Sequence, residues 1–306
     1  MIDFFLNNPP LICVAVRAQF APLEKIAEYI PDLQEAFRLK KYPHFGTSEM
    51  NNLRVDQDAQ AGMNLTFENL TRWSFSNLEK TICVRVDRES VTLFFADYHH
   101  FSQTQPIYLE ILEIIEAKIP SLTLVELQLR YINHIPLNAG ENPADWVIPS
   151  VLGMHALVGL IREGSISQTS YQTLEGGSLI VRCAALAHGL TLPADILPLD
   201  INLKHPLHRT TPFVMLENTH TQIPKTAQFA AETCLNPTFA MGDYYRQPSD
   251  GIVMRTCAFI VATMGLAPGQ EFQWQQAAVP ISLFKKSEVV ANATISPKAG
   301  DFIATI

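Results

Sequence analysis

The sequence predicts an α+β protein built on a mostly antiparallel sheet with its helices on one face. The strongest observation is residues 121–137, where apolar and polar side chains alternate with the period of a β-strand. Shorter segments alternate in the same way, and two others have the apolar spacing of an amphipathic helix. In the first half their order is strand, helix, three strands, helix, strand, which is related to the ferredoxin-like β-α-β-β-β-α-β arrangement.

The first half holds most of the elements that can be predicted. Two helices are expected, and Pro31 removes a backbone donor from the first, so that region forms either two short helices or one kinked helix. A polar stretch without periodicity, residues 42–62, is expected to be a long loop. The predicted strands are residues 11–20, 70–75, 81–87, 91–98 and 121–137, and the predicted helices are residues 23–37 and 102–119.

A turn-rich stretch, Asn138–Pro143, marks the best domain boundary. It divides the chain into an α+β antiparallel-sheet domain, residues 1–137, and a β-rich second domain, residues 144–306. Prolines interrupt residues 204–250, so the fold of residues 204–306 is left open apart from one strand and a few short ones in the tail. Strands of the second domain are expected at residues 165–174, 178–188, 196–203 and 213–219.

Composition sets limits on the function. Of the 306 residues, 47% are apolar and 17% are charged, and the formal net charge of −8 argues against a general affinity for nucleic-acid backbones. No apolar run approaches the roughly 18 residues of a membrane span, and the acidic start does not fit a signal peptide. The five cysteines are scattered and form no CxxC pair. We therefore expect a cytoplasmic protein without a membrane partner.

The candidate site is the polar face of the first-half sheet. Strand parity places three arginines, an acid and a histidine on the side opposite the apolar layer, and guanidinium groups gathered there would suit a carboxylate or a phosphate. Two alternatives are ion pairs on a solvated face, and arginines that bridge to a second half covering this face. The candidate ligand- or partner-binding residues are Arg17, Arg85, Glu126, Arg130 and His134.

The same parity makes a sharper prediction for residues 121–137. Leu129 and Tyr131 should be buried against the helix that contains residues 107–115, while Arg130 and His134 face away from it. A carboxylate in the apolar segment around Asp200 should be paired, for example with an arginine.

Motifs that would indicate catalysis, a metal or a cofactor are missing from the sequence. There is no GxSxG elbow, HExxH motif or glycine-rich phosphate loop. The adjacent His99 and His100 point to opposite sides of a strand, so they are poorly placed to share one metal ion. We expect no catalytic residues, no metal and no cofactor.

Several pieces of the first half carry a family resemblance: PPLICVAVRAQF near the start, the proline-containing helix region that ends in Tyr42-Pro43, WSFS at residues 73–76, and above all LRYINHI at residues 129–135. In these pieces the chain resembles a sporadically distributed family of uncharacterised bacterial and archaeal proteins. The resemblance covers roughly residues 8–137. In the second half, LPLDINL at residues 197–203 is similar to a Leu-Asp-containing strand of the family members, and from Lys204 onward the chain departs from the family. It implies a fold and a patchy bacterial gene history, and no mechanism.

Two hypotheses of different classes follow. The first is a non-enzymatic binding or scaffold protein that acts through a protein partner or as a homo-oligomer, encoded in a mobile or defence-type locus as the patchy distribution of its relatives implies. The second is a nucleic-acid- or nucleotide-binding protein that uses the arginine-lined sheet face against phosphates.

Overall fold

The computed structural model describes most of the first 223 residues and three short pieces beyond them. The described residues are 5–6, 10–58, 62–98, 101–147, 151–153, 163–172, 177–223, 272–273, 293–298 and 301–305. Within these ranges no helix is long and apolar enough to cross a membrane.

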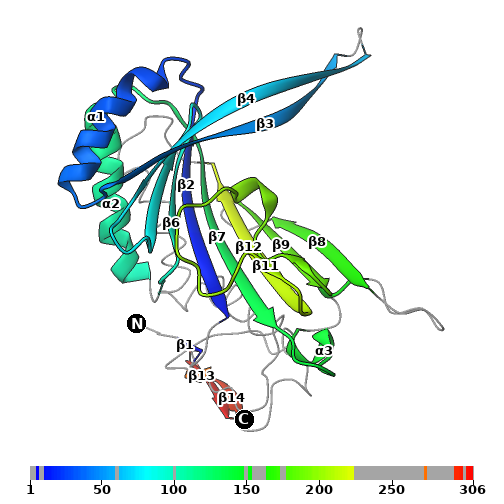
Figure 1. Ribbon diagram of the computed structural model, residues 1–306. Coiled ribbons are helices and arrows are strands. Elements are labelled where there is room, and N and C mark those ends of the chain that lie inside the picture. The colour runs from blue at the N-terminus through cyan, green and yellow to red at the C-terminus, as the bar shows by residue number, and fades with distance from the viewer. Residues whose placement is uncertain are drawn as a thin grey trace.

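One antiparallel sheet of nine strands forms the body of the protein, in the order β3-β4-β5-β6-β2-β7-β12-β9-β8 (Figure 1). The α+β class and the mostly antiparallel sheet are thus confirmed. Its strands are β2 (Leu11–Phe20), β3 (His44–Asp58), β4 (Gly62–Ser76), β5 (Ile82–Val86), β6 (Ser90–Phe95), β7 (Leu124–Pro136), β8 (Gly164–Gln172), β9 (Ser178–Leu186) and β12 (Phe213–Gln222).

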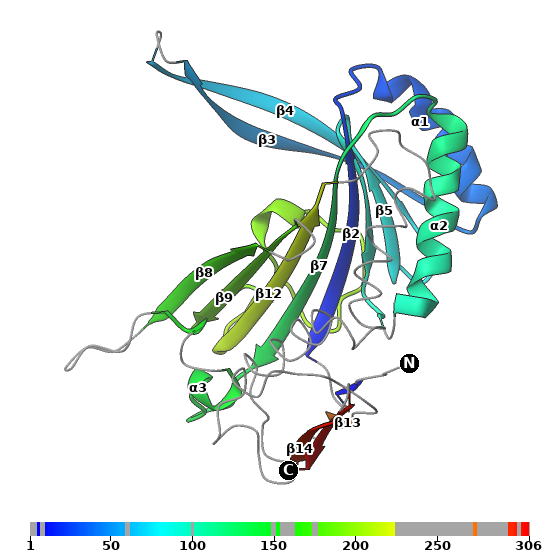
Figure 2. The same cartoon turned by 180° about the vertical axis from the view of Figure 1, so that it is seen from behind.

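Two helices, α1 (Ile26–Leu39) and α2 (Phe101–Lys118), pack side by side on one face of this sheet (Figures 1 and 2). Helix α1 is a single helix that continues through Pro31. Leu129 and Tyr131 of β7 are buried in the same apolar cluster as Ile111, Leu112 and Ile115 of α2, as predicted. At the start of β7 Leu124 is buried and Val125 is exposed, because the pairing register with β2 shifts at that end of the strand.

The apolar face continues beyond the two helices. Ile135, on the same side of β7 as Leu129, packs with Leu216 of β12 and Cys183 of β9. Val147 and Leu152, which follow the short helix α3 (Pro143–Trp146), close this end of the core. Apolar residues therefore line one whole side of the sheet from β4 to β9.

The strands β3 and β4 form a long ribbon that runs away from the rest of the sheet in both views (Figures 1 and 2). The prediction of a loop over residues 42–62 was wrong, because β3 pairs with β4 along its entire length. The observed order is therefore strand, helix, four strands, helix, strand, and the ferredoxin-like relation stays a prediction. Residues 42–62 lack the alternation of apolar and polar residues by which a strand with one buried face is recognised in a sequence.

A second covering element crosses the opposite face of the sheet (Figure 1). We call it the strap: residues 187–212, which connect β9 to β12. The strand expected at residues 196–203 lies here and was wrong, since those residues pair with no strand. The strap contains the small pair β10 (Gly189–Leu190) and β11 (His208–Arg209), and the 3-10 turn η2 (Ala194–Ile196).

The second half of the chain contributes three strands to the same sheet. β12 pairs with β7 from Phe213↔Pro136 to Gln222↔Leu127, so the sheet continues across the expected boundary at Asn138–Pro143. The division into domains 1–137 and 144–306 stays a prediction, since most of residues 224–306 lie outside the described part. Short strands predicted for the tail are present as β13 (Phe272–Gln273), which pairs with β1 (Phe5–Leu6), and as the pair β14 (Ala293–Lys298) and β15 (Asp301–Thr305).

Candidate functional site

Strand register brings the predicted arginines together on the face opposite the helices. Thr92 of β6 is paired with Arg85 of β5 on one side and with Arg17 of β2 on the other. All three share one row across the sheet, so the two arginine Cα atoms are two strand spacings, about 10 Å, apart. The guanidinium groups of Arg17 and Arg85 are therefore able to approach each other above Thr92.

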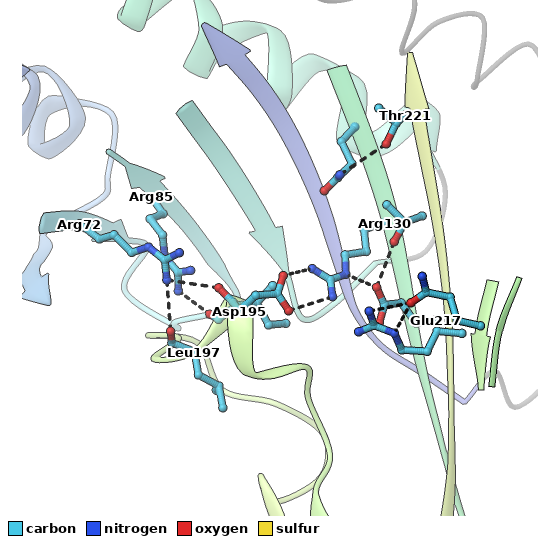
Figure 3. A network of polar contacts seen from close by, with 12 residues as sticks. Arg72, Arg85, Arg130, Asp195, Leu197, Glu217 and Thr221 are labelled. Carbon is cyan, nitrogen blue, oxygen red and sulfur yellow. Dashed lines mark hydrogen bonds and ion pairs between the residues drawn. The ribbon is translucent and has the colours of Figure 1, made fainter. Parts of the chain in front are cut away.

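The strap fixes two of the arginines through its backbone. Arg72 of β4 donates from Nη1 to the carbonyls of Asp195 and Leu197, both at 3.2 Å (Figure 3). Arg85 donates from Nη2 to the carbonyl of Ile196 at 2.7 Å and also to that of Pro198. Both side chains are buried, and no carboxylate of a described residue lies in ion-pair contact with either.

Arg130 holds the strap in a different way, through carboxylates. Its Nη1 and Nη2 reach the two oxygens of Asp195 at 2.6 and 3.2 Å (Figure 3). Its Nε forms an ion pair at 2.7 Å with Glu217 of β12, whose other oxygen lies 3.5 Å from Arg182 of β9. Desolvation of the carboxylate would raise the pKa of Asp195, but the side chain is 61% exposed and the Arg130 guanidinium more than offsets this, so the pKa lies below its ordinary value. Arg130 is thus a neutralised bridge between the two halves of the chain.

A cavity of about 250 Å³ remains between the strap and the sheet, and we call it the strap pocket. Four arginines line it together with three acidic residues. The lining comes from strands β2, β4, β5, β6 and β7, from the β5–β6 turn and from η2. The lining residues are Ala15, Arg17, Leu70, Arg72, Arg85, Asp87, Glu89, Ser90, Thr92, Phe94, Gln128, Arg130, Asp195 and Ile196.

Buried positive charge dominates the inner wall of the strap pocket. Burial, with the charge of Arg72 next, lowers the pKa of Arg85 to about 10, and the guanidinium lies 4.7 Å from the ring centroid of Phe94. The pKa of Arg72 is also lowered, first by burial. Asp87 uses both carboxylate oxygens at the β5–β6 turn, accepting from the backbone N–H of Glu89 and the hydroxyl of Ser90, each at 2.9 Å.

Arg17 differs from the other three arginines. Its side chain is half-buried, and no hydrogen bond or ion pair joins it to another residue in the described part of the chain. Its charge still acts at a distance: it is the smallest of the causes that shift the pKa of Arg72, and it opposes the rise that burial causes in the pKa of Glu126.

Two of the predicted site residues lie outside the strap pocket. Glu126 is half-buried on the correct face, but it is not among the lining residues, where Gln128 stands instead. His134 is fully buried and packs against the rings of His205 and Phe213, each 5.0 Å away between centroids. It lies four positions from Arg130, about 13 Å along a strand, so shared parity did not bring the two side chains together.

Among the residues that bind the strap to the sheet, Arg72 and Asp195 were not predicted from the sequence. Arg72 lies in the part of β4 that was predicted as a strand, and its parity relative to Arg85 could have placed it on this face. Asp195 carries no local signal, because its contact with Arg130 spans 65 residues of sequence. Asp200 is paired as predicted, with Lys80 at 2.7 Å rather than with an arginine.

The described residues offer little for metal binding or nucleophilic catalysis. Among them no group of three or more His, Cys, Asp or Glu side chains could hold a metal ion, and His99 and His100 lie outside the described residues. Cys13 is buried beside this face, and burial raises the pKa of its thiol to about 12, which keeps it protonated.

Comparisons with known proteins add no name to this geometry. No family model matches the chain, and neither a curated protein nor a solved structure matches it. The resemblance of residues 8–137 to a sporadically distributed family stays a prediction.

Proposed function

We propose that this chain is a non-enzymatic binding protein that acts through a protein partner, and that the partner docks along the β3–β4 ribbon. The observation that carries the proposal is the pairing of β4. Only Trp73–Ser76 of β4 pair with β5, so residues 62–72 pair with β3 alone. At about 3.3 Å per residue this leaves more than 30 Å of ribbon with two strands only.

A two-stranded ribbon by itself is at best marginally stable in water, and residues 62–72 of β4 pair with no third strand among the described strands. Strand β3 is also an edge of the sheet, so one row of its backbone N–H and C=O groups has no strand partner among the described strands. A partner that adds a strand to β3 would satisfy these groups and stabilise the ribbon.

Two adjacent proline variants on β3, Glu49→Pro and Met50→Pro, test this proposal. Because neighbouring residues of a strand direct their N–H groups to opposite sides, one variant removes a bond to β4 and the other blocks only the free edge. Thermal unfolding tells them apart, since the variant that keeps the wild-type Tm is the one at the free edge. We expect that variant to lose the protein that co-purifies in stoichiometric amount with tagged wild type from its own host, with neighbouring genes present.

Two results would contradict the proposal. One is wild-type protein recovered alone and monomeric by light scattering from that host. The other is a free-edge variant that retains its partner as well as wild type does. A homo-oligomer that the free-edge variant converts to a monomer would support the same surface with a second copy of the chain as partner.

A nucleic-acid- or nucleotide-binding function is the second candidate, and it is supported by the four arginines around the strap pocket. Affinity for an oligonucleotide should then fall steeply as the salt concentration rises. Replacing Arg17 with an uncharged residue should make this salt dependence less steep, because Arg17 is not paired with a carboxylate of a described residue and is therefore available to a phosphate. Binding that is absent or independent of salt removes this candidate.

A further inference from the structure

We propose that the strap pocket binds a small dianionic oxyanion of the phosphate class, held by Arg17, Arg72 and Arg85. This inference does not depend on the partner of the ribbon, because it rests on different residues on a different part of the sheet. Its basis is the balance of charge, the unused donors and the size of the cavity.

The charges that line the pocket do not cancel. Asp195 is committed to Arg130, and Glu89 lies 3.0 Å from Arg88. Among the lining residues, three guanidinium groups then face the single carboxylate of Asp87, a surplus of two positive charges. The carboxylate of Glu126 lies outside the lining and acts on Arg17 alone of the three. Buried charges are normally paired, and two of these cations are buried with only backbone carbonyls as acceptors. A dianion restores neutrality.

Unused donors point to the same ligand. Nε of Arg72 is buried and has no hydrogen-bond partner among the described residues, and Arg72 as a whole is only 8% exposed. Arg17 has its whole guanidinium without a partner in the described part of the chain. Guanidinium groups present planar forks of N–H donors, which match the paired oxygens of a phosphate.

The dimensions of the pocket select a small ligand and give it a path of entry. A volume of about 250 Å³ is below the roughly 300–1,000 Å³ of sites for drug-sized molecules, so the pocket fits a small ion better than a large ligand. Arg17, Leu70 and Gln128 are partly exposed, whereas Arg72 and Arg85 are buried. An anion can therefore enter past Arg17 and reach the buried pair.

Isothermal titration with sodium orthophosphate at pH 7.5, in a constant background of sodium chloride, tests this inference. We expect saturable binding that Arg17→Gln weakens roughly ten- to hundred-fold, the usual effect of losing a charged hydrogen bond. Arg17→Gln should fold like wild type, because Arg17 has no partner to lose. Arg38→Gln is the matched control, since it removes the same charge from an exposed arginine on α1 and should leave affinity within about two-fold.

The same titration with other anions identifies the source of the phosphate group. Tighter binding of adenosine monophosphate or glycerol phosphate than of orthophosphate indicates a phosphate ester, and the reverse order indicates the free ion; either supports the class. Malonate, a dicarboxylate of similar charge, should bind at least about ten-fold more weakly because its oxygens are spread over two groups. The inference is overturned if orthophosphate does not bind, if malonate binds equally well, or if Arg17→Gln and Arg38→Gln behave alike.

Should Arg17→Gln unfold, Gln128→Leu at the same entrance replaces it. We expect this variant to weaken phosphate binding at least about three-fold, and an unchanged affinity would contradict the proposed path of entry.

Discussion

The two faces of the central sheet bury their side chains for different reasons. On the helix side, Leu129 and Tyr131 lie in one continuous apolar cluster with α1 and α2. On the strap side, Arg72, Arg85 and Arg130 are almost as well buried, yet they are charged and held by carbonyls and carboxylates. One face is stabilised by the removal of apolar surface from water, and the other by polar contacts that must each be made in full.

This difference predicts two kinds of response to change. The helix side should tolerate changes of pH and salt and respond to lost volume. The strap side should respond to lost partners and to protonation, because an unpaired buried charge costs more than a small cavity.

The largest effect is expected for Arg130→Ala. It leaves Glu217, whose side chain is only 5% exposed, without its nearest cation, and should lower the free energy of unfolding by about 3–5 kcal/mol. Urea unfolding of this variant beside a double variant, Arg130→Met with Glu217→Leu, separates charge from packing. The double variant should recover most of the loss, and a double variant as unstable as the single one would show that volume, not charge, governs this face.

Leu129→Ala probes the helix side at the neighbouring position of β7. Leu129 is 1% exposed and packs within the cluster that includes α2, so its truncation should cost roughly 2–5 kcal/mol. The loss should stay constant between pH 5 and pH 8, because no charge is involved. A loss that changes with pH in this range would remove the contrast between the two faces.

His134 should make the strap side sensitive to mild acid. Burial, reinforced by His205 and Arg209, lowers the pKa of His134 to about 4, so the folded protein keeps it neutral while the unfolded chain takes up a proton below its ordinary pKa of 6.5. Its stability contribution is therefore full above pH 6.5 and is lost as the pH falls toward 4, by roughly 3 kcal/mol in total. Urea unfolding from pH 7.5 to 4.5 should show a shallower decline in His134→Leu than in wild type; equal slopes would mean that other groups carry the pH dependence.

The sequence predicted the elements whose apolar residues recur with a clear period. Strands β2, β5, β6 and β7 show the alternation of a strand, and both helices show the apolar spacing of a helix. The ribbon was missed because alternation needs a buried side, and β3 has exposed residues such as Phe45 even near its base. Parity also placed the arginines on the correct face, although it could not say how far along the face each would lie.

The strap shows why alternation can mislead. Leu197, Leu199, Ile201 and Leu203 alternate as a strand would, and all four pack against the apolar cluster on this face of the sheet. The alternation correctly indicated that these side chains are buried, but the strap lies across the sheet and its backbone makes few of the hydrogen bonds that define a strand. Asp195 was missed for a related reason, because only tertiary packing brings it to Arg130.

The smallest effect concerns the outer fastening of the strap, where Lys80 forms an ion pair with Asp200 at 2.7 Å, each side chain 37% exposed. At this exposure solvent screens the pair, so Lys80→Ala should lower the free energy of unfolding by at most about 1 kcal/mol.

Lys80 also has a φ of +53°, which an L-residue adopts at a cost and glycine adopts freely. Lys80→Gly loses the same ion pair but relieves the backbone, so it should be more stable than Lys80→Ala by roughly 1 kcal/mol. Thermal unfolding of the two variants measures the difference, and hydrogen exchange at Asn202, whose N–H donates to the Lys80 carbonyl at 2.7 Å, reports whether the strap itself loosens. If both variants lose stability equally, the loss comes from the ion pair and the backbone conformation of Lys80 contributes nothing to the difference between them.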